Sequence, residues 1–174
     1  FVPHSHRAFE CWKQPTGTGA ARNTPESRVN GFYKAHYRKL LVNSLRDLDS
    51  ERLYAHVGSI GYGVYANESI MMVVDFDHRG YHKEAENCLQ TWLDFQGTKM
   101  LPGNFTDKDG LLYGADGSES GGYNKHHGYV MWGLAEHWWF TRDREWMKKV
   151  APKLIMSCDW VIRQRKTTMV SNPD

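Results

Sequence analysis

Two stretches of the chain are apolar on nearly every side when they are read at helical spacing. Residues 64–78 contain a run of five apolar residues, 70–74, without a polar position, and residues 124–140 are apolar almost throughout after their first turn. A helix that is hydrophobic all round is normally buried on all its faces. We therefore expect both stretches to form interior helices.

Three other stretches, residues 32–48, 81–96 and 144–165, have one apolar face and one charged face. Such spacing predicts amphipathic helices. Asp143 is placed to cap the last of them, and Pro152 either begins a new helix or kinks this one. The residues that the spacing puts on the apolar face of that helix are Met147, Val150, Leu154, Ile155, Cys158, Val161 and Ile162.

The remaining segments have no helical period. Residues 1–31 are polar and rich in Gly, Pro and Thr, which predicts an irregular N-terminal arm before a helical-hairpin region over 32–174. Residues 51–63 are expected to form a glycine-containing loop with short extended pieces. Residues 97–122 form a long acidic loop, and a loop of that length in a compact domain is usually functional or mobile.

A buried helix, an Arg-containing turn and an amphipathic helix occur in this order twice, over 64–96 and 126–165. Repeated hairpins of this kind bury their faces on one another. Arranged in a ring they form an α/α toroid, so the predicted fold class is all-α. The inner helices then run parallel, and their first turns meet on one rim, which brings Glu68 near Asn124, His126 and His127.

Composition narrows the function classes only slightly. The net charge of +2 gives no strong attraction to nucleic acid or acidic membranes, and there is no apolar run of about 18 residues. The 3 cysteines are widely spaced and fit neither a disulfide framework nor a zinc site, so we expect no metal and no cofactor. Neither end has the look of a natural terminus, which suggests a fragment or a processed piece.

Five short stretches, 40–45, 62–68, 89–96, 124–129 and 159–165, together resemble the first hairpins of the six-hairpin glycosidases. These are (α/α)6-barrel glycoside hydrolases, which include glucoamylase-like and rhamnosidase-like enzymes. The resemblance covers roughly residues 32–166, which correspond to part of such a barrel. It implies that a sugar binds in the central funnel. Members usually carry an acid near the entrance of an early inner helix in a Trp-x-Arg-Asp context, whereas the matching stretch here is Tyr65-Ala66-Asn67-Glu68.

Glycoside hydrolysis needs two carboxyl groups that flank the scissile bond. The candidates are Glu68, Asp116 and Glu119. Glu68 is alternatively a first-turn carboxylate favoured by the helix dipole, and the two loop acids are alternatively solvated or bind Ca²⁺. Adjacent helical residues point about 100° apart, so only one of the two adjacent histidines is expected to face the funnel. The predicted substrate-binding residues are Tyr65, Tyr123, Asn124, His126, His127 and Trp132.

The predicted function is that of a carbohydrate-active protein, a glycoside hydrolase acting on an oligo- or polysaccharide through paired carboxylates at the toroid mouth. One alternative is a polysaccharide lyase that uses Tyr123, Asn124, His126 and Tyr129 to move a proton of a uronate. Another is a non-catalytic half-toroid that self-associates through its open edges into a homo-oligomer. We expect a carbohydrate substrate, with no nucleic acid and no membrane, and a periplasmic or secreted location.

Overall fold

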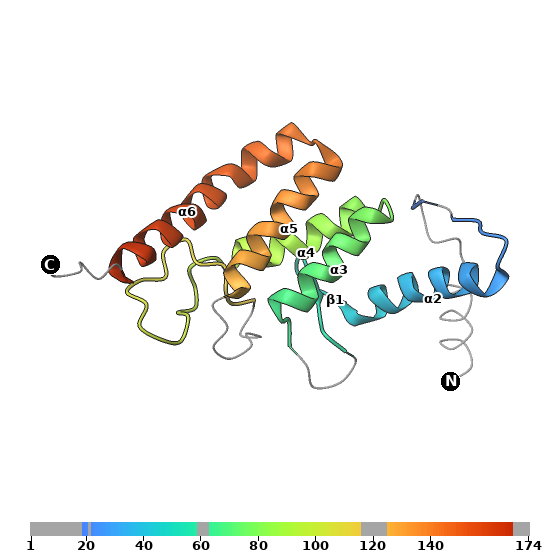
Figure 1. Cartoon of the computed structure of the whole chain (residues 1–174), viewed down its shortest axis with the longest axis horizontal. Helices are drawn as coiled ribbons and strands as arrows, with labels where there is room; N and C mark the ends of the chain where they lie inside the picture. Colours follow the sequence, from blue (N-terminus) through green and yellow to red (C-terminus); the bar gives the residue numbers. More distant parts are fainter. Residues whose placement is uncertain (1–18, 21, 59–62, 116–124, 169–174) are drawn as a thin grey trace, which may run out of the picture.

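The computed structural model describes residues 19–20, 22–58, 63–115 and 125–168. This part of the chain is mostly helical, which confirms the all-α prediction (Figure 1). The helices are α2 (Ser27–Asn43), α3 (Ala66–His78), α4 (His82–Asp94), α5 (Lys125–Thr141) and α6 (Arg144–Thr168), and the strands are β1 (Ser44–Arg46) and β2 (Leu53–Ala55).

Helices α3 and α5 lie side by side at the centre of the molecule and run in the same direction (Figure 1). Ile70 and Val73 of α3 are wholly buried, as are Val130 and Leu134 of α5. The helices approach closely at Gly133, where a Cβ atom would lie only 2.7 Å from Cγ2 of Ile70. The two helices therefore pack side by side in parallel, as expected from the sequence.

Helix α4 follows α3 after a tight turn and packs against both α3 and α5. Gly80 closes this turn with a φ of +81°, a left-handed conformation that glycine adopts without a Cβ penalty. Cys88, Leu89 and Trp92 of α4 are buried while Lys83 is exposed, so the predicted amphipathic character of this helix is confirmed.

The prediction of a helix over 32–48 was wrong at both ends. Helix α2 already begins at Ser27, inside the range expected to be irregular, and residues 44–46 leave it to form β1. Strand β1 pairs antiparallel with β2, so that Ser44 lies opposite Ala55. Ser69 of α3 donates a hydrogen bond to the Ala55 carbonyl, and Thr91 of α4 donates one to the Leu53 carbonyl. These tertiary hydrogen bonds hold the small sheet and override the local helical pattern.

Helix α6 begins where the sequence predicts. The Asp143 carboxylate accepts hydrogen bonds from the backbone N–H groups of Glu145 and Trp146 at 2.9 and 3.0 Å, which confirms the predicted N-cap. Pro152 lies inside α6 and does not begin a new helix.

The first half of α6 buries Val150 and packs Met147 and Leu154 against the core, as predicted, but its second half buries a different face. Ile155 and Ile162 are 61% and 51% exposed, whereas Ser157, Trp160 and Gln164 are buried against the segment 97–115. The reason is polar pairing. Trp160 donates its indole N–H to the Asp107 carbonyl, and Ser157 donates to the Gly110 carbonyl, so the loop binds the side of α6 that carries these polar groups.

The expectation that the two inner helices are buried on all faces was also wrong. Met71 of α3 is 53% exposed, and Trp139 of α5 is 66% exposed. Each helix buries the side that faces its neighbours, and the opposite side of α5 is left uncovered by the described part of the chain. Within the described residues, every helix is too short or too polar to cross a membrane.

Candidate functional site

The first turns of α3 and α5 lie at the same end of this helix pair (Figure 1). We call this end the rim and define it by Tyr65, Glu68, Tyr113 and His126. Glu68 belongs to the first turn of α3, and its Oε2 atom is buried with no hydrogen-bond partner in the part of the chain that the structure describes. Such atoms are uncommon in folded proteins, and a ligand, a water molecule or a catalytic role is the usual explanation.

His126, in the first turn of α5, lies within electrostatic range of Glu68 in the first turn of α3. It is 1% exposed, and its ring stacks on Tyr113 with centroids 6.1 Å apart. Burial lowers the pKa of His126, Lys125 lowers it further, and the nearby Glu68 carboxylate opposes both effects. The imidazole is therefore mostly neutral at pH 7, and it is able to accept or donate a proton beside a carboxylate.

His127 has no such capacity, although the sequence predicted it as a substrate-binding residue. Its Nδ1 accepts a hydrogen bond from the Leu112 N–H at 3.0 Å, and its Nε2 donates one to the Ser157 carbonyl at 3.1 Å. Burial lowers the pKa of His127 to about 4, against the smaller opposite effect of the bond to Ser157. Both ring nitrogens are thus committed to tying α5 to the neighbouring loop and to α6.

The other described candidates divide between the rim and the surface. Tyr65 is the half-buried N-cap residue of α3 and lies at the rim. Trp132 is 40% exposed and donates its indole N–H to Glu136 of the same helix at 3.0 Å. Because Trp132 lies on the exposed side of α5 and His126 on the buried side, the structure does not bring these two residues together.

Four predicted residues, Asp116, Glu119, Tyr123 and Asn124, lie outside the described residues. Glu68 is thus the only predicted catalytic carboxylate that the described part of the chain positions.

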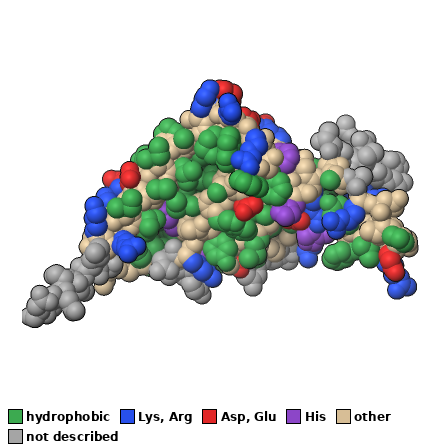
Figure 2. Space-filling model, turned by 45° about the horizontal axis from the view of Figure 1, so that its top comes forward, with side chains coloured by type: hydrophobic (Ala, Val, Ile, Leu, Met, Phe, Trp, Pro, Cys, Tyr) green, Lys and Arg blue, Asp and Glu red, His purple; other side chains and the backbone are tan. Residues whose placement is uncertain are grey.

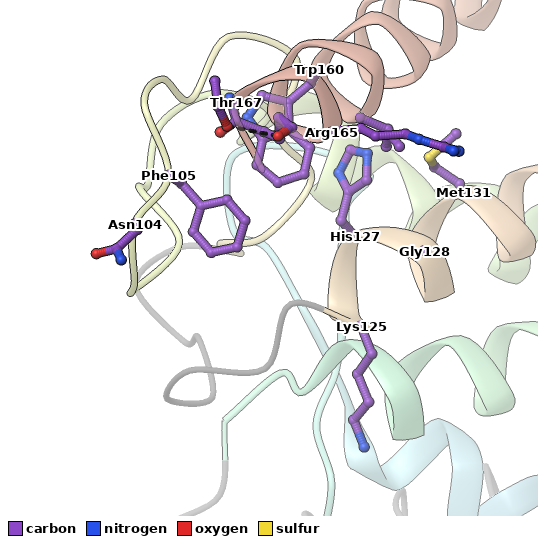
Figure 3. Close-up of a pocket in the computed structure, with 11 residues that line it drawn as sticks. Asn104, Phe105, Lys125, His127, Gly128, Met131, Trp160, Arg165 and Thr167 are labelled. Atoms are coloured by element: carbon purple, nitrogen blue, oxygen red, sulfur yellow. Dashed lines mark hydrogen bonds between the residues drawn. The ribbon is translucent and has the colours of Figure 1, made fainter. Parts of the chain in front are cut away.

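A groove of about 490 Å³ opens between α5 and α6 beside the rim (Figure 3). It is lined by Met131 of α5, by Val161 and Arg165 of α6, and by Phe105 of the segment between α4 and α5. The buried Gln164 in its wall is already hydrogen-bonded to Thr106 and Asp107. The groove therefore presents mainly apolar groups and a guanidinium, while Lys125 extends away from the other labelled side chains.

A second cluster of acid and histidine lies at the opposite end of α3 and α5. The Asp77 side chain is fully buried, and both its oxygens lie 3.0 Å from Nδ1 of His137. His82 at the start of α4 approaches Asp77 to 2.8 Å. Cys88 lies close by, but burial raises the pKa of its thiol, with Glu84 and Asp77 acting in the same direction, which disfavours a thiolate nucleophile.

Reasoning from the sequence missed the Asp77–His137 pair. The available signal was that polar residues near the ends of two otherwise apolar helices must find partners inside the core. Among the described residues, no group of three or more His, Cys, Asp or Glu side chains has an arrangement that could hold a metal ion.

Comparisons of this chain with protein-family models, with curated proteins and with solved structures found no match.

Proposed function

We propose that this chain contributes the substrate-binding rim of a glycoside hydrolase built on an α/α toroid, with Glu68 as one of its catalytic carboxyl groups. Two parallel inner helices, each followed by a second helix in a hairpin, support the toroid. The substrate is an oligo- or polysaccharide, whose ring faces and hydroxyl groups suit a rim that combines aromatic rings with polar groups.

The single observation that carries this proposal is the buried Oε2 atom of Glu68, which is unpartnered in the part of the chain that the structure describes. One of its carboxylate oxygens is buried without a partner among the described residues, next to the neutral imidazole of His126. A structural carboxylate at a helix start normally accepts hydrogen bonds or faces water. An unpartnered oxygen beside a group that exchanges protons suits a general acid or base that acts on a bound glycosidic oxygen.

Hydrolysis needs a second carboxyl group, about 5–5.5 Å from the first in retaining enzymes and about 6.5–9.5 Å in inverting ones. Asp116 and Glu119 are the proposed partners because they belong to the loop that leads into the rim end of α5. Tyr65 and His126 complete the proposed contacts with sugar hydroxyl groups.

A polysaccharide lyase is the second candidate, and His126 favours it. A neutral histidine stacked on a tyrosine ring is the pair of residue types that removes and returns a proton during β-elimination of a uronate. The two candidates differ in their products, because a lyase leaves a new double bond in the sugar and a hydrolase does not.

The test is an assay of the 174-residue chain on a panel of neutral and uronate-containing polysaccharides, followed by reducing-end formation and by absorbance near 230 nm. We expect reducing ends without the absorbance, and a loss of about 100-fold or more in rate for Glu68→Gln. The matched control is Glu145→Gln, a carboxamide substitution at a 75% exposed side chain of α6, which is expected to keep the full rate.

An unchanged rate for Glu68→Gln would refute the catalytic role of Glu68. Absorbance near 230 nm that is lost in His126→Gln would instead establish the lyase. If no polysaccharide in the panel is bound or cleaved, the carbohydrate proposal itself is wrong.

A further inference from the structure

The groove between α5 and α6 has the size of a small-molecule site. Its volume of about 490 Å³ falls within the range that such sites usually have. Its lining comes from the first half of α5, the second half of α6 and the loop residues Asn104 and Phe105 (Figure 3). Because this lining includes neither Glu68 nor His126, the groove is a candidate binding site separate from the one proposed for hydrolysis.

Aromatic rings form much of the groove wall. Phe105 stacks on Trp160 of α6, with ring centroids 5.6 Å apart and 28° between the ring planes. The Trp160 ring in turn lies 4.8 Å from the ring of His127 on α5. Met131 and Val161 add aliphatic groups to the lining. Such a wall favours the flat apolar ring of a ligand over a strongly hydrated group.

Hydrogen bonds hold the aromatic part of this wall in place. Trp160 donates its indole N–H to the Asp107 carbonyl at 2.8 Å. The amide nitrogen of Gln164 donates to the Thr106 hydroxyl at 3.1 Å and to the Asp107 carboxylate at 3.0 Å. The loop that carries Phe105 is thus fastened to α6, so a ligand does not have to order the wall when it binds.

The Lys and Arg residues that line the groove differ in their directions. They are Lys125 of α5 and Arg165 of α6. Lys125 extends away from the other labelled side chains, whereas Arg165 extends from α6 toward Met131, which lines the same groove (Figure 3). Figure 2 shows basic side chains where α6 ends, beside the apolar side chains of the face that α5 and α6 present. A guanidinium at the edge of an apolar hollow suits a carboxylate, which it binds through two parallel hydrogen bonds.

Acidic side chains do not cancel this positive charge. The groove lining contains no Asp or Glu. The Asp107 carboxylate, behind the wall, accepts a hydrogen bond from the Arg163 guanidinium at 2.8 Å. Asp159 precedes Val161 by two positions, so its side chain leaves α6 about 160° away from the one that lines the groove.

We propose that the groove between α5 and α6 binds a small aromatic carboxylate. The ring of this ligand lies against Phe105, Met131 and Val161, and its carboxylate pairs with the guanidinium of Arg165. The proposal does not rest on the carbohydrate function, because the two sites share none of the residues that carry each argument.

The experiment measures binding of 2-naphthoate and 2-naphthamide to the 174-residue chain by isothermal titration calorimetry. The two probes have the same rings and differ in the charge of one group. Arg165→Met removes the guanidinium from the groove. The matched control Arg144→Met makes the same change at the other end of α6, outside the groove lining.

A second pair of variants tests the position of the site. Val161→Glu places a negative charge on a groove residue that is 43% exposed. The matched control is Ile162→Glu, because Ile162 is the next residue, is 51% exposed and does not line the groove. Circular dichroism checks that every variant keeps its helical content, which substitutions at exposed positions are expected to preserve.

We expect 2-naphthoate to bind with a Kd of about 1 mM or lower and 2-naphthamide to bind about tenfold or more weakly. Arg165→Met should raise the Kd of 2-naphthoate to that of 2-naphthamide and leave the latter unchanged. Val161→Glu should weaken 2-naphthoate binding about tenfold or more. Arg144→Met and Ile162→Glu should bind both probes like the unmodified chain.

Three results would overturn the proposal. Equal affinity for both probes, or binding of neither, would exclude recognition of an aromatic carboxylate. Equal losses in Val161→Glu and Ile162→Glu would place the binding outside the groove. Light scattering that finds a dimer dissociated by Val161→Glu but not by Ile162→Glu, without 2-naphthoate binding, would assign the groove to a second copy of the chain.

Discussion

The two ends of the α3–α5 pair each carry an acid and a histidine, but the two acids differ in their hydrogen-bond partners. At one end the buried Asp77 is held by His137 and approached by His82. At the other end Glu68 lies beside His126, yet one of its oxygens has no partner in the described chain. A carboxylate whose hydrogen bonds are complete within the fold stabilises it, whereas a carboxylate with an open oxygen is free to serve a ligand. The comparison separates a structural acid–histidine pair from a candidate catalytic one.

The largest expected loss of stability comes from breaking the buried Asp77–His137 pair. Asp77→Ala leaves His137 buried without its partner, and loss of one member of such a buried pair typically costs about 3–5 kcal/mol. Urea unfolding followed by circular dichroism measures the change. The control Glu145→Ala removes an exposed carboxylate and should alter the free energy of unfolding by less than about 1 kcal/mol. A similar small loss for Asp77→Ala would show that the buried pair does not hold the helices together.

His127, next to the end that carries Glu68, makes the stability of the fold depend on pH. Its pKa of about 4 in the fold lies below the ordinary 6.5, so the unfolded chain binds the extra proton first as pH falls. The stabilisation is complete above pH 6.5 and is lost between pH 6.5 and about 4, by about 3 kcal/mol at most. Unfolding of the unmodified chain and of His127→Gln across this range measures it. Equal pH slopes for the two proteins would contradict the prediction.

Gly133 lies between the two ends, at a point where α5 closely approaches Ile70. Gly133→Ala forces Ile70 to move and should destabilise the fold by about 1–3 kcal/mol. The matched control is Gly128→Ala on the same helix, because nothing lies within 4 Å of the added methyl group there. That control should gain up to about 1 kcal/mol from helix propensity. Thermal unfolding compares the two, and a gain at both positions would disprove the close approach.

The smallest expected change in stability belongs to Glu68. Glu68→Gln keeps the size of this half-buried side chain and breaks no hydrogen bond at Oε2, so the free energy of unfolding should stay within about 1 kcal/mol of the unmodified chain. The same urea series measures it. A loss as large as that of Asp77→Ala would make Glu68 a structural residue and would erase the difference between the two ends.

The contrast between His126 and His127 could not be predicted from the sequence. His126 and His127 are adjacent and were equivalent candidates. Only the packing of α5 against α3 on one side, and against the loop and α6 on the other, gives them different surroundings. The 100° step between helical neighbours predicts a difference, but not which residue faces Glu68.

Helix α6 illustrates a case in which the sequence predicted the wrong buried side. Its spacing correctly predicts an amphipathic helix, and the usual inference buries the apolar side. The structure instead buries Ser157, Trp160 and Gln164, because the loop 97–115 offers their polar groups backbone and side-chain partners. Periodicity reports which residues share a face, and it carries no information about which face finds a neighbour.

The sequence by itself determined helices α3 to α6 within a few residues and the Asp143 cap, since these depend on side-chain spacing and on contacts between near neighbours. The strand at 44–46, the Asp77–His137 pair and the exposure of α6 were decided by tertiary structure. Each of these depends on groups many residues apart in the chain, and their meeting follows from how whole helices pack rather than from any local pattern.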